Sequence, residues 1–573
     1  MSPRNLTAIT KHAEAGNMTE QQWWRDAVIY QIYPRSWADS DGDGMGDLPG
    51  ITARLPHLAD LGVDAVWLSP FYTSPQHDAG YDVADYRDVD PRFGTLADAD
   101  ALIARAHELG LRVMVDIVPN HSSSEHVWFQ EALDSGPGSP ARARYVFRDG
   151  RGPDGDQPPN NWQSTFGGSA WERATEPDGS PGQWYLHLFD ASQPDFDWTT
   201  PEVGDEMESV LRFWLDRGAD GFRIDVAHGL VKASGLPDAP PGHEIADTER
   251  TSDLPMWDQP GVHDIYRRWR RLTDSYAVAG EDADRILCAE AWVVPADALA
   301  AYVRPDELHQ SFNFAFLMSP WIASALKQEI KASLEAVAEI RSPQTWVLSN
   351  HDVVRHASRL GYEPVPGPLR LSGIGADDPQ PDAAVGLRRA RAATTVMLAL
   401  PGSAYLYQGE ELGLPEATRL PDEARQDPTW ERSGHTSRGR DGCRVPIPWE
   451  RDAPSYGFGP SEKAWLPQPE VYGELAVDRQ TGVQGSTLEL YRRLLRLRRE
   501  HRPGRGELSW VDLGEGVLAF DVTGATGPGI RVIANVDRDH LPLPDGAEIL
   551  AASGEIDVVE GLPRDCAVWL RRP

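Results

Sequence analysis

The sequence is poor in cysteine and has no long apolar run. Its 573 residues include only Cys288, Cys443 and Cys566, an odd number of cysteines that lie far apart. They form neither a disulfide framework nor a zinc-binding spacing, so a reducing cytoplasm fits this usage. No run approaches the roughly 18 apolar residues of a membrane-spanning helix. Residues 1–20 form a polar tail without the apolar core of a signal peptide, and we expect a cytoplasmic protein.

Basic charge is also in short supply. Lys and Arg number 55 against 88 Asp and Glu, which gives a net charge of -33. Such acidity repels the phosphates of nucleic acids and anionic membranes, and we expect neither as a partner. The composition is otherwise ordinary for a globular protein, with 40% hydrophobic and 25% charged residues. The length predicts more than one domain.

Short apolar segments alternate with helix-like patterns along most of the chain. Eight of them are predicted as strands: 27–37, 63–70, 113–121, 220–225, 286–292, 311–316, 345–352 and 404–411. Nearly continuous apolar strands are typical of parallel sheets that are buried on both faces. The alternation therefore predicts a (β/α)8 TIM barrel over residues 21–121 and 199–502.

One intervening segment shows the helix pattern in full. In residues 95–110, Thr95 and Asp98 have the spacing of a capping box. One apolar face follows, formed by Ala99, Leu102, Ile103, Ala106 and Leu109. Gly110 ends the pattern, so a single amphipathic helix is predicted.

Three stretches interrupt the alternation, and the chain ends in a different pattern. Residues 122–198, after the third strand, are too long for a structureless loop and predict an inserted B domain. Residues 360–385 and 415–470 follow the seventh and eighth strands, and we expect lid loops there. From 503 to 573, short strands punctuated by Gly, Pro and Asp predict an antiparallel β domain, expected to be a β-sandwich.

Polar side chains gather where four of the predicted strands end. They are Asp116, Asn120 and His121 on the third strand, Arg223 and Asp225 on the fourth, Glu290 on the fifth, and His351 and Asp352 on the seventh. In a parallel barrel these carboxyl ends meet at one mouth, where catalysis takes place. Because clustered carboxylates repel one another, a purely structural role explains the whole set poorly.

Three carboxylates in one pocket favour glycoside hydrolysis. One ionised carboxylate attacks the anomeric carbon while a second carboxyl group of raised pKa protonates the leaving oxygen, and a separation of about 5–5.5 Å retains configuration. Arg223 and Asp225 share one side of a strand, so we expect the arginine to lower the pKa of Asp225 and keep it ionised. A structural ion pair is the alternative. The apolar neighbours of Glu290 suit the acid.

Residues 39–47, Asp-Ser-Asp-Gly-Asp-Gly-Met-Gly-Asp, place acids at alternate positions between glycines. This spacing is typical of a calcium loop, with ligands from Asp39, Asp41, Asp43, the Met45 carbonyl and Asp47. The EF-hand loop is not matched, because no glutamate stands at its twelfth position. We expect a structural cation, calcium or in its place magnesium, and a metal-free acidic turn is the alternative.

Four motifs together resemble the core signatures of family 13 glycoside hydrolases, the α-amylase superfamily, in its α-glucosidase and oligo-1,6-glucosidase branch. They are DIVPNH (116–121), GFRIDV (221–226), AEAW (289–292) and SNHD (349–352). The resemblance implies that Asp225 is the nucleophile, Glu290 the acid/base and Asp352 the transition-state stabiliser. It also implies which residues line the −1 subsite for the terminal glucose: His121, Arg223 and His351.

Further segments resemble the same branch. HDAGYDVADY (77–86) implies that Tyr81 stacks on the sugar and that Asp78 grips the terminal glucose. GRDGCRVPIPW (439–449) implies that Arg444 pairs with Asp78 to close the pocket, with Arg440 reaching across the entrance. Phe166, in the inserted domain, is a further expected substrate contact. QPDFDW (193–198) is similar to the fifth signature, and residues 39–47 match the cation loop of the branch.

The residue after the nucleophile, Val226, bears on linkage. In this branch valine there implies α-1,6 cleavage, whereas alanine or threonine implies α-1,4. The surrounding sequence resembles actinobacterial α-glucosidases, in which valine at this position need not exclude cleavage of α-1,4 bonds. We expect a retaining exo-α-glucosidase that releases glucose from short maltose- or isomaltose-type oligosaccharides through a glucosyl-aspartate intermediate. The alternatives are a strict oligo-1,6-glucosidase, a transferase or isomerase acting on maltose or sucrose, and a catalytically inactive binding protein.

Overall fold

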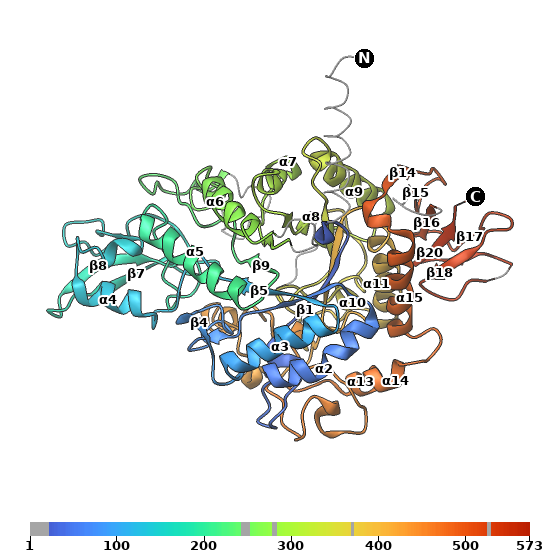
Figure 1. The fold of residues 1–573 in the computed structure, drawn as a ribbon, viewed down its shortest axis with the longest axis horizontal. Coiled ribbons are helices and arrows are strands. Elements are labelled where there is room, and N and C mark those ends of the chain that lie inside the picture. Colours follow the sequence, from blue (N-terminus) through green and yellow to red (C-terminus); the bar gives the residue numbers. More distant parts are fainter. Residues whose placement is uncertain are drawn as a thin grey trace, which may run out of the picture.

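Eight parallel strands form a barrel at the centre of the molecule (Figure 1). The computed structural model describes residues 22–241, 253–277, 284–367, 372–523, 529–557 and 559–572. The tail expected at 1–20 and residues 368–371 of the first lid loop lie outside these ranges. The barrel strands are β1 (Val28–Ile32), β2 (Ala65–Leu68), β5 (Arg112–Ile117), β9 (Gly221–Ile224), β10 (Ile286–Ala289), β11 (Gln310–Ser311), β12 (Thr345–Val347) and β13 (Ser403–Tyr407).

The strand order β11-β10-β9-β5-β2-β1-β13-β12 closes on itself through a parallel bridge between Phe312 and Thr345. Every residue of β1, β2, β9, β10, β12 and β13 is buried, as parallel strands covered on both faces require. The predicted barrel is confirmed, and its strands bring their carboxyl ends to one mouth.

Helices surround the barrel. The longer ones are α2 (Leu48–Leu61), α3 (Leu96–Glu108), α5 (Pro201–Asp216), α6 (Val262–Asp274), α9 (Ala323–Ala338), α11 (Ala383–Met397) and α15 (Thr487–His501). Short helices α7 (Ala296–Ala300), α10 (His356–Arg359), α12 (Pro428–Arg432), α13 (Glu470–Glu474) and α14 (Val477–Gln480) lie between them in the chain. The capping box predicted for α3 is present, because the Thr95 and Asp98 side chains each accept from the other's backbone N–H.

One predicted strand is largely a helix. The apolar run 311–316 was expected to be a single strand, but β11 ends at Ser311 and α8 (Phe314–Met318) follows. The Asn313 side chain accepts a hydrogen bond from the N–H of Phe316 and so starts the helix. Periodicity alone does not separate a short buried strand from a short buried helix.

Two smaller units flank the barrel on opposite sides (Figure 1). Between β5 and α5 the chain forms α4 (Val127–Ser135) and a three-stranded antiparallel sheet of β6 (Phe147–Arg148), β7 (Trp171–Thr175) and β8 (Pro181–Leu186). A hairpin of β3 (Tyr72–Thr73) and β4 (Asp85–Val89) follows β2. The segment with α4, β6, β7 and β8 follows the third barrel strand, so the inserted domain of the predicted fold is confirmed.

After α15 the chain forms a five-stranded antiparallel sheet and a two-stranded one, as the predicted C-terminal β fold requires. Their strands are β14 (Glu507–Trp510), β15 (Val517–Thr523), β16 (Ile530–Asn535), β17 (His540–Leu541), β18 (Ile549–Ala552), β19 (Leu562–Pro563) and β20 (Cys566–Arg571). All three cysteines are free and buried. None of the described helices combines the length and apolar composition that crossing a membrane requires.

Replacing Leu102 by Ala should lower the free energy of unfolding by about 2–5 kcal/mol, because a cavity replaces a fully buried side chain on α3. Leu102 is 1% exposed. Leu109 ends the same helix and is only half-buried, so Leu109→Ala is the matched control and should lose about 1 kcal/mol. Urea unfolding at constant m-value measures both, and equal losses would contradict the greater burial of Leu102.

Candidate active site

One buried guanidinium joins three carboxyl groups at the barrel mouth. Strand register places Arg223 of β9 beside Asp116 of β5. Its Nη1 lies 3.0 Å from Asp116 Oδ1 and 2.7 Å from Asp225 Oδ1, and its Nη2 lies 3.4 Å from Glu290 Oε2. The Arg223 side chain is 1% exposed, so these charges act on one another with little screening by water.

Burial has the largest effect on the pKa values of the two facing carboxyl groups, Asp225 and Glu290. It raises the pKa of Asp225 well above its usual value, and Arg223 opposes this shift without cancelling it. Arg223 therefore lowers the pKa of Asp225 as the sequence predicts, but the expectation that this keeps the net pKa low is wrong, because burial outweighs the ion pair. Burial also raises the pKa of Glu290, as its apolar neighbours predicted. The pair thus retains a proton to higher pH than exposed carboxyl groups do.

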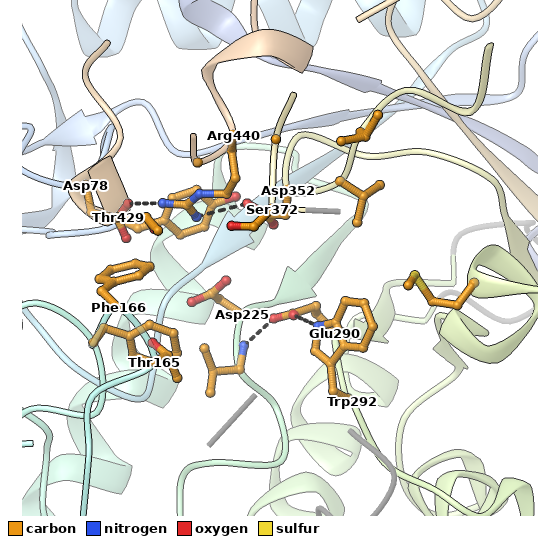
Figure 2. Close-up of a pocket in the computed structure, with 18 of the residues that line it drawn as sticks. Asp78, Thr165, Phe166, Asp225, Glu290, Trp292, Asp352, Ser372, Thr429 and Arg440 are labelled. Carbon is orange, nitrogen blue, oxygen red and sulfur yellow. Dashed lines mark hydrogen bonds and ion pairs between the residues drawn. The ribbon is translucent and has the colours of Figure 1, made fainter. Parts of the chain in front are cut away.

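Two donors fix Glu290. The backbone N–H of Val226 donates to Oε2 at 2.8 Å, and Trp292 Nε1 donates to Oε1 at 2.8 Å (Figure 2). Val226 has a φ of 46°, a left-handed conformation that is rare for a β-branched residue and occurs at functional sites. The Trp292 ring stacks on Phe314 with a centroid distance of 4.0 Å. Glu290 is therefore held in one orientation towards Asp225.

Asp352 belongs to a second charge cluster, which the lid loop supplies. Its Oδ1 accepts from Arg440 Nη1 and Arg444 Nη2, each at 3.0 Å. Burial would raise the pKa of Asp352, but His351 and these arginines outweigh it and lower the pKa below the usual range. Within the described chain, Asp78 pairs with Arg440 (Nη2 to Oδ1, 2.9 Å). The expected pairing of Asp78 with Arg444 is therefore wrong, because Arg444 lies deeper, against Asp352 and the carbonyl of His351.

Two neutral histidines support the site, His121 in its wall and His351 behind it. His351 Nε2 lies 2.6 Å from the Tyr81 hydroxyl, and the two rings stack with an interplanar angle of 7°. Gln193 Nε2 donates to Asp78 and lies 3.1 Å from His121 Nε2. Burial lowers the pKa of His121 to about 4 and that of His351 well below its usual value, so both rings are uncharged at neutral pH.

These groups line a cavity of about 430 Å³ (Figure 2). Nine of the predicted site residues face it: Asp78, Tyr81, His121, Phe166, Asp225, Val226, Glu290, Asp352 and Arg440. Arg223, His351 and Arg444 lie behind this wall and contact its residues. Lining residues from both lid regions, Ser372, Thr429 and Arg440 among them, meet over the same mouth.

Sequence reasoning missed several residues of the cavity. They are Phe189, His228, Trp257, Met318 and, behind Arg440, Asp427. His228 stacks on Trp257 with centroids 4.8 Å apart. His228 stands three residues after Asp225 and was open to prediction from that proximity. Nothing local marked Trp257 or Asp427, because each reaches the site through loop folding.

The predicted cation loop brings three acids together. Carboxylate oxygens of Asp39, Asp41 and Asp43 lie within 4.8 Å of one another. Asp47 is engaged elsewhere, because it caps α2 by accepting from the N–H of Gly50 and also binds Ser40. Oxygen donors at this spacing suit a hard divalent cation, so the three acids could bind a metal. The loop packs on the second lid region, where Ser461 donates to the carbonyl of Gly42.

Comparison with known proteins places this geometry in a family. The "Alpha amylase, catalytic domain" model matches residues 31–504. A probable α-glucosidase of Rhizobium meliloti (strain 1021) is 40% identical over 524 residues, 87% of each chain. The oligo-1,6-glucosidase of Parageobacillus thermoglucosidasius is 34% identical over 518 residues, 84% of each chain.

A solved structure agrees with these sequence matches. The crystal structure of the α-glucosyl transfer enzyme XgtA has a TM-score of 0.82 and 37% identity, covering 96% of this chain and 100% of that one. The resemblance seen in the four motifs is thereby confirmed. The chain belongs to the α-amylase family, family 13 of the glycoside hydrolases, in the branch of α-glucosidases, oligo-1,6-glucosidases and maltases.

Proposed function

We propose that this enzyme, which acts on α-glucosides by hydrolysis or glucosyl transfer, is a retaining exo-acting α-glucosidase. The observation that carries the proposal is that Asp225 and Glu290 bind neighbouring nitrogens of the one Arg223 guanidinium. This shared partner favours the short carboxyl separation of retaining enzymes, about 5–5.5 Å, over the wider one of inverting enzymes.

The chemistry follows from this pair. An Asp225 oxygen attacks the anomeric carbon while Glu290 donates its proton to the leaving oxygen, so that a glucosyl ester forms as the glycosidic bond breaks. Glu290, now ionised, takes a proton from water, and the water oxygen displaces Asp225. Two inversions retain the α configuration. Asp352, which stays ionised, stabilises the positive charge that develops on the sugar ring.

The closed end of the cavity supports exo action. Asp78 and Asp352 are both held by Arg440, and Tyr81 stacks on His351 in the same site. Such a wall offers hydroxyl partners to one terminal glucose and no passage for a longer chain. We therefore propose release of single glucose units from short maltose- or isomaltose-type substrates.

Linkage and acceptor are the finer parts of the proposal. Val226 lines the cavity beside Glu290, where the leaving group departs, and we propose that both α-1,4 and α-1,6 bonds are cleaved. The likeness to an α-glucosyl transfer enzyme favours a second candidate, transfer of glucose to a sugar acceptor. It would use the same residues, with an alcohol in place of water.

Incubation with maltose, isomaltose and sucrose, followed by product analysis, tests the function. We expect free glucose to dominate from maltose and isomaltose at dilute substrate. Asp225→Asn should lose on the order of 10⁴-fold or more in kcat, because the nucleophile is removed. A slow 5-fluoro-glucosyl substrate should label the wild type on Asp225. Transfer products dominating at dilute substrate would replace hydrolysis by the second candidate.

Glu290→Gln separates acid catalysis from nucleophilic attack. Wild-type kcat/KM should be bell-shaped: it falls at low pH as Asp225 gains a proton and at high pH as Glu290 loses one, both at raised pKa values. The variant should lose the alkaline limb. It should also lose far less rate on a dinitrophenyl glucoside, whose leaving group needs no proton, than on maltose. Equal losses on both substrates would remove Glu290 from the acid role.

We also propose that the acidic loop binds a structural calcium ion, with magnesium as the alternative. Asp39, Asp41 and Asp43 would hold it, with the Met45 carbonyl as a further oxygen donor, while Asp47 caps α2. The bound ion would offset two of the three negative charges and stabilise the loop against the lid segment that carries Ser461. It lies outside the catalytic chemistry.

After chelator treatment, added calcium should raise the melting temperature in proportion to the logarithm of its concentration, because it binds the folded state. Asp43→Asn should abolish the increase. Asp60→Asn, an exposed acid of α2 outside the loop, is the matched control and should leave it unchanged. Magnesium is compared in parallel. A calcium-independent melting temperature in the wild type would leave the loop a metal-free turn.

A further inference from the structure

The guanidinium of Arg440 points two nitrogens into the pocket like a fork, while a carboxylate behind it binds its Nε. Its outer nitrogens donate to Asp352 (Nη1, 3.0 Å) and Asp78 (Nη2, 2.9 Å). Its Nε and backbone N–H both donate to Oδ2 of Asp427, at 2.5 and 2.8 Å. The Asp427 carboxylate is fully buried. The guanidinium is planar, so fixing Nε leaves it little freedom other than to point both outer nitrogens into the pocket.

The chain is built around this contact. Asp427 precedes α12, and its other oxygen, Oδ1, accepts from the N–H of Thr429 at 2.9 Å. Asp441 Oδ2 in turn accepts from the backbone N–H of Asp427. Gly439 has a φ of 66°, and a Cβ there would lie 2.8 Å from Asp427 Cγ. Two separated lid segments are thus pressed together at this carboxylate.

We infer that Asp427 is the positioning residue for Arg440: it aims the fork so that Asp78 and Asp352 converge on one sugar at a fixed spacing. The inference rests on the proposed function, because it assigns the two carboxylates to a bound glucose. Without Asp427, Arg440 has other rotamers open to it, and two like-charged acids lose the cation that holds them side by side. Pre-organised polar groups bind a sugar without the cost of ordering them.

Asp427 could instead have a purely structural role, as the cap of α12. The two roles rest mainly on different oxygens of the one carboxylate. Oδ1 accepts from the N–H of Thr429 at 2.9 Å and more distantly from Arg440 Nη2 at 3.3 Å, whereas the two shortest contacts of Arg440 use Oδ2. Asparagine caps helices about as well as aspartate, so Asp427→Asn keeps an acceptor for Thr429. It then turns an amide N–H₂ towards the Nε and N–H of Arg440, placing donor against donor. The substitution therefore spares the cap and disturbs the fork.

The test is a double-mutant cycle with D427N, R440Q and the double variant, measuring KM on maltose and the inhibition constant of glucose. D427N should raise both about 10- to 100-fold, the range for a lost hydrogen bond to a charged group. In the R440Q background the same substitution should add no more than about twofold, because the residue acts through Arg440. Equal effects in the two backgrounds would overturn the inference.

The matched control is Asp422→Asn, in the same lid but with an exposed side chain that pairs with Arg438 at 3.2 Å. It should leave both constants within about twofold of the wild type. Should D427N fail to fold, Asp427→Glu keeps the charge but shifts the carboxylate by one methylene, and unchanged glucose binding there would overturn the inference. A wild type without activity on any α-glucoside would overturn the proposed function. An active wild type whose KM and glucose inhibition constant are unchanged in D427N would overturn the inference alone.

Discussion

A single buried cation makes the catalytic centre possible. Asp116, Asp225 and Glu290 come from three adjacent strands, and without compensation their charges would repel in a site from which water is largely excluded. Arg223 contacts all three. A guanidinium suits this place because it stays charged when buried and offers donors along several directions. Its position is fixed by the register of β9 against β5, so the barrel's backbone hydrogen bonds ultimately set the geometry of the catalytic pair.

The lid loops supply the arginines of a second cluster. The carboxyl groups of the two clusters have pKa values that are shifted in opposite directions. Asp225 and Glu290 share one arginine, and burial keeps their pKa values raised. Asp352 contacts both Arg440 and Arg444, and together with His351 they outweigh burial and keep it ionised. One pocket therefore holds carboxyl groups that carry a mobile proton beside one that does not. Acid catalysis needs the first condition and charge stabilisation needs the second.

What the sequence predicted depended on how local the signal was. The eight strands and the polar residues at their ends follow from periodicity and from chain order, so the barrel and the meeting of Asp225 with Glu290 were predictable. Arg444 was expected to pair with Asp78 and Arg440 to reach across the entrance, because both stand in one motif and only the path of the lid decides which of them meets Asp78. The pKa of Asp225 was misjudged for a similar reason: the sequence shows the neighbouring arginine but not the depth of burial. Asp427 had no marker beyond the helix start that follows it.

Val226 shows why the preference for one glycosidic linkage cannot be explained by side-chain size alone. Its side chain lines the cavity, yet its backbone N–H, held at a positive φ, donates to the carboxyl group proposed as the acid. A β-branched residue adopts that φ only at a cost in strain of about 1–3 kcal/mol, which the surrounding contacts must offset. Changing the residue alters the space beside the leaving group, and it also alters the strain that aims the N–H at Glu290. A shift in preference between α-1,4 and α-1,6 bonds on substitution would therefore combine a steric effect on the aglycone with an electrostatic effect on the proton donor. The two separate only when rates are compared on leaving groups that need no protonation.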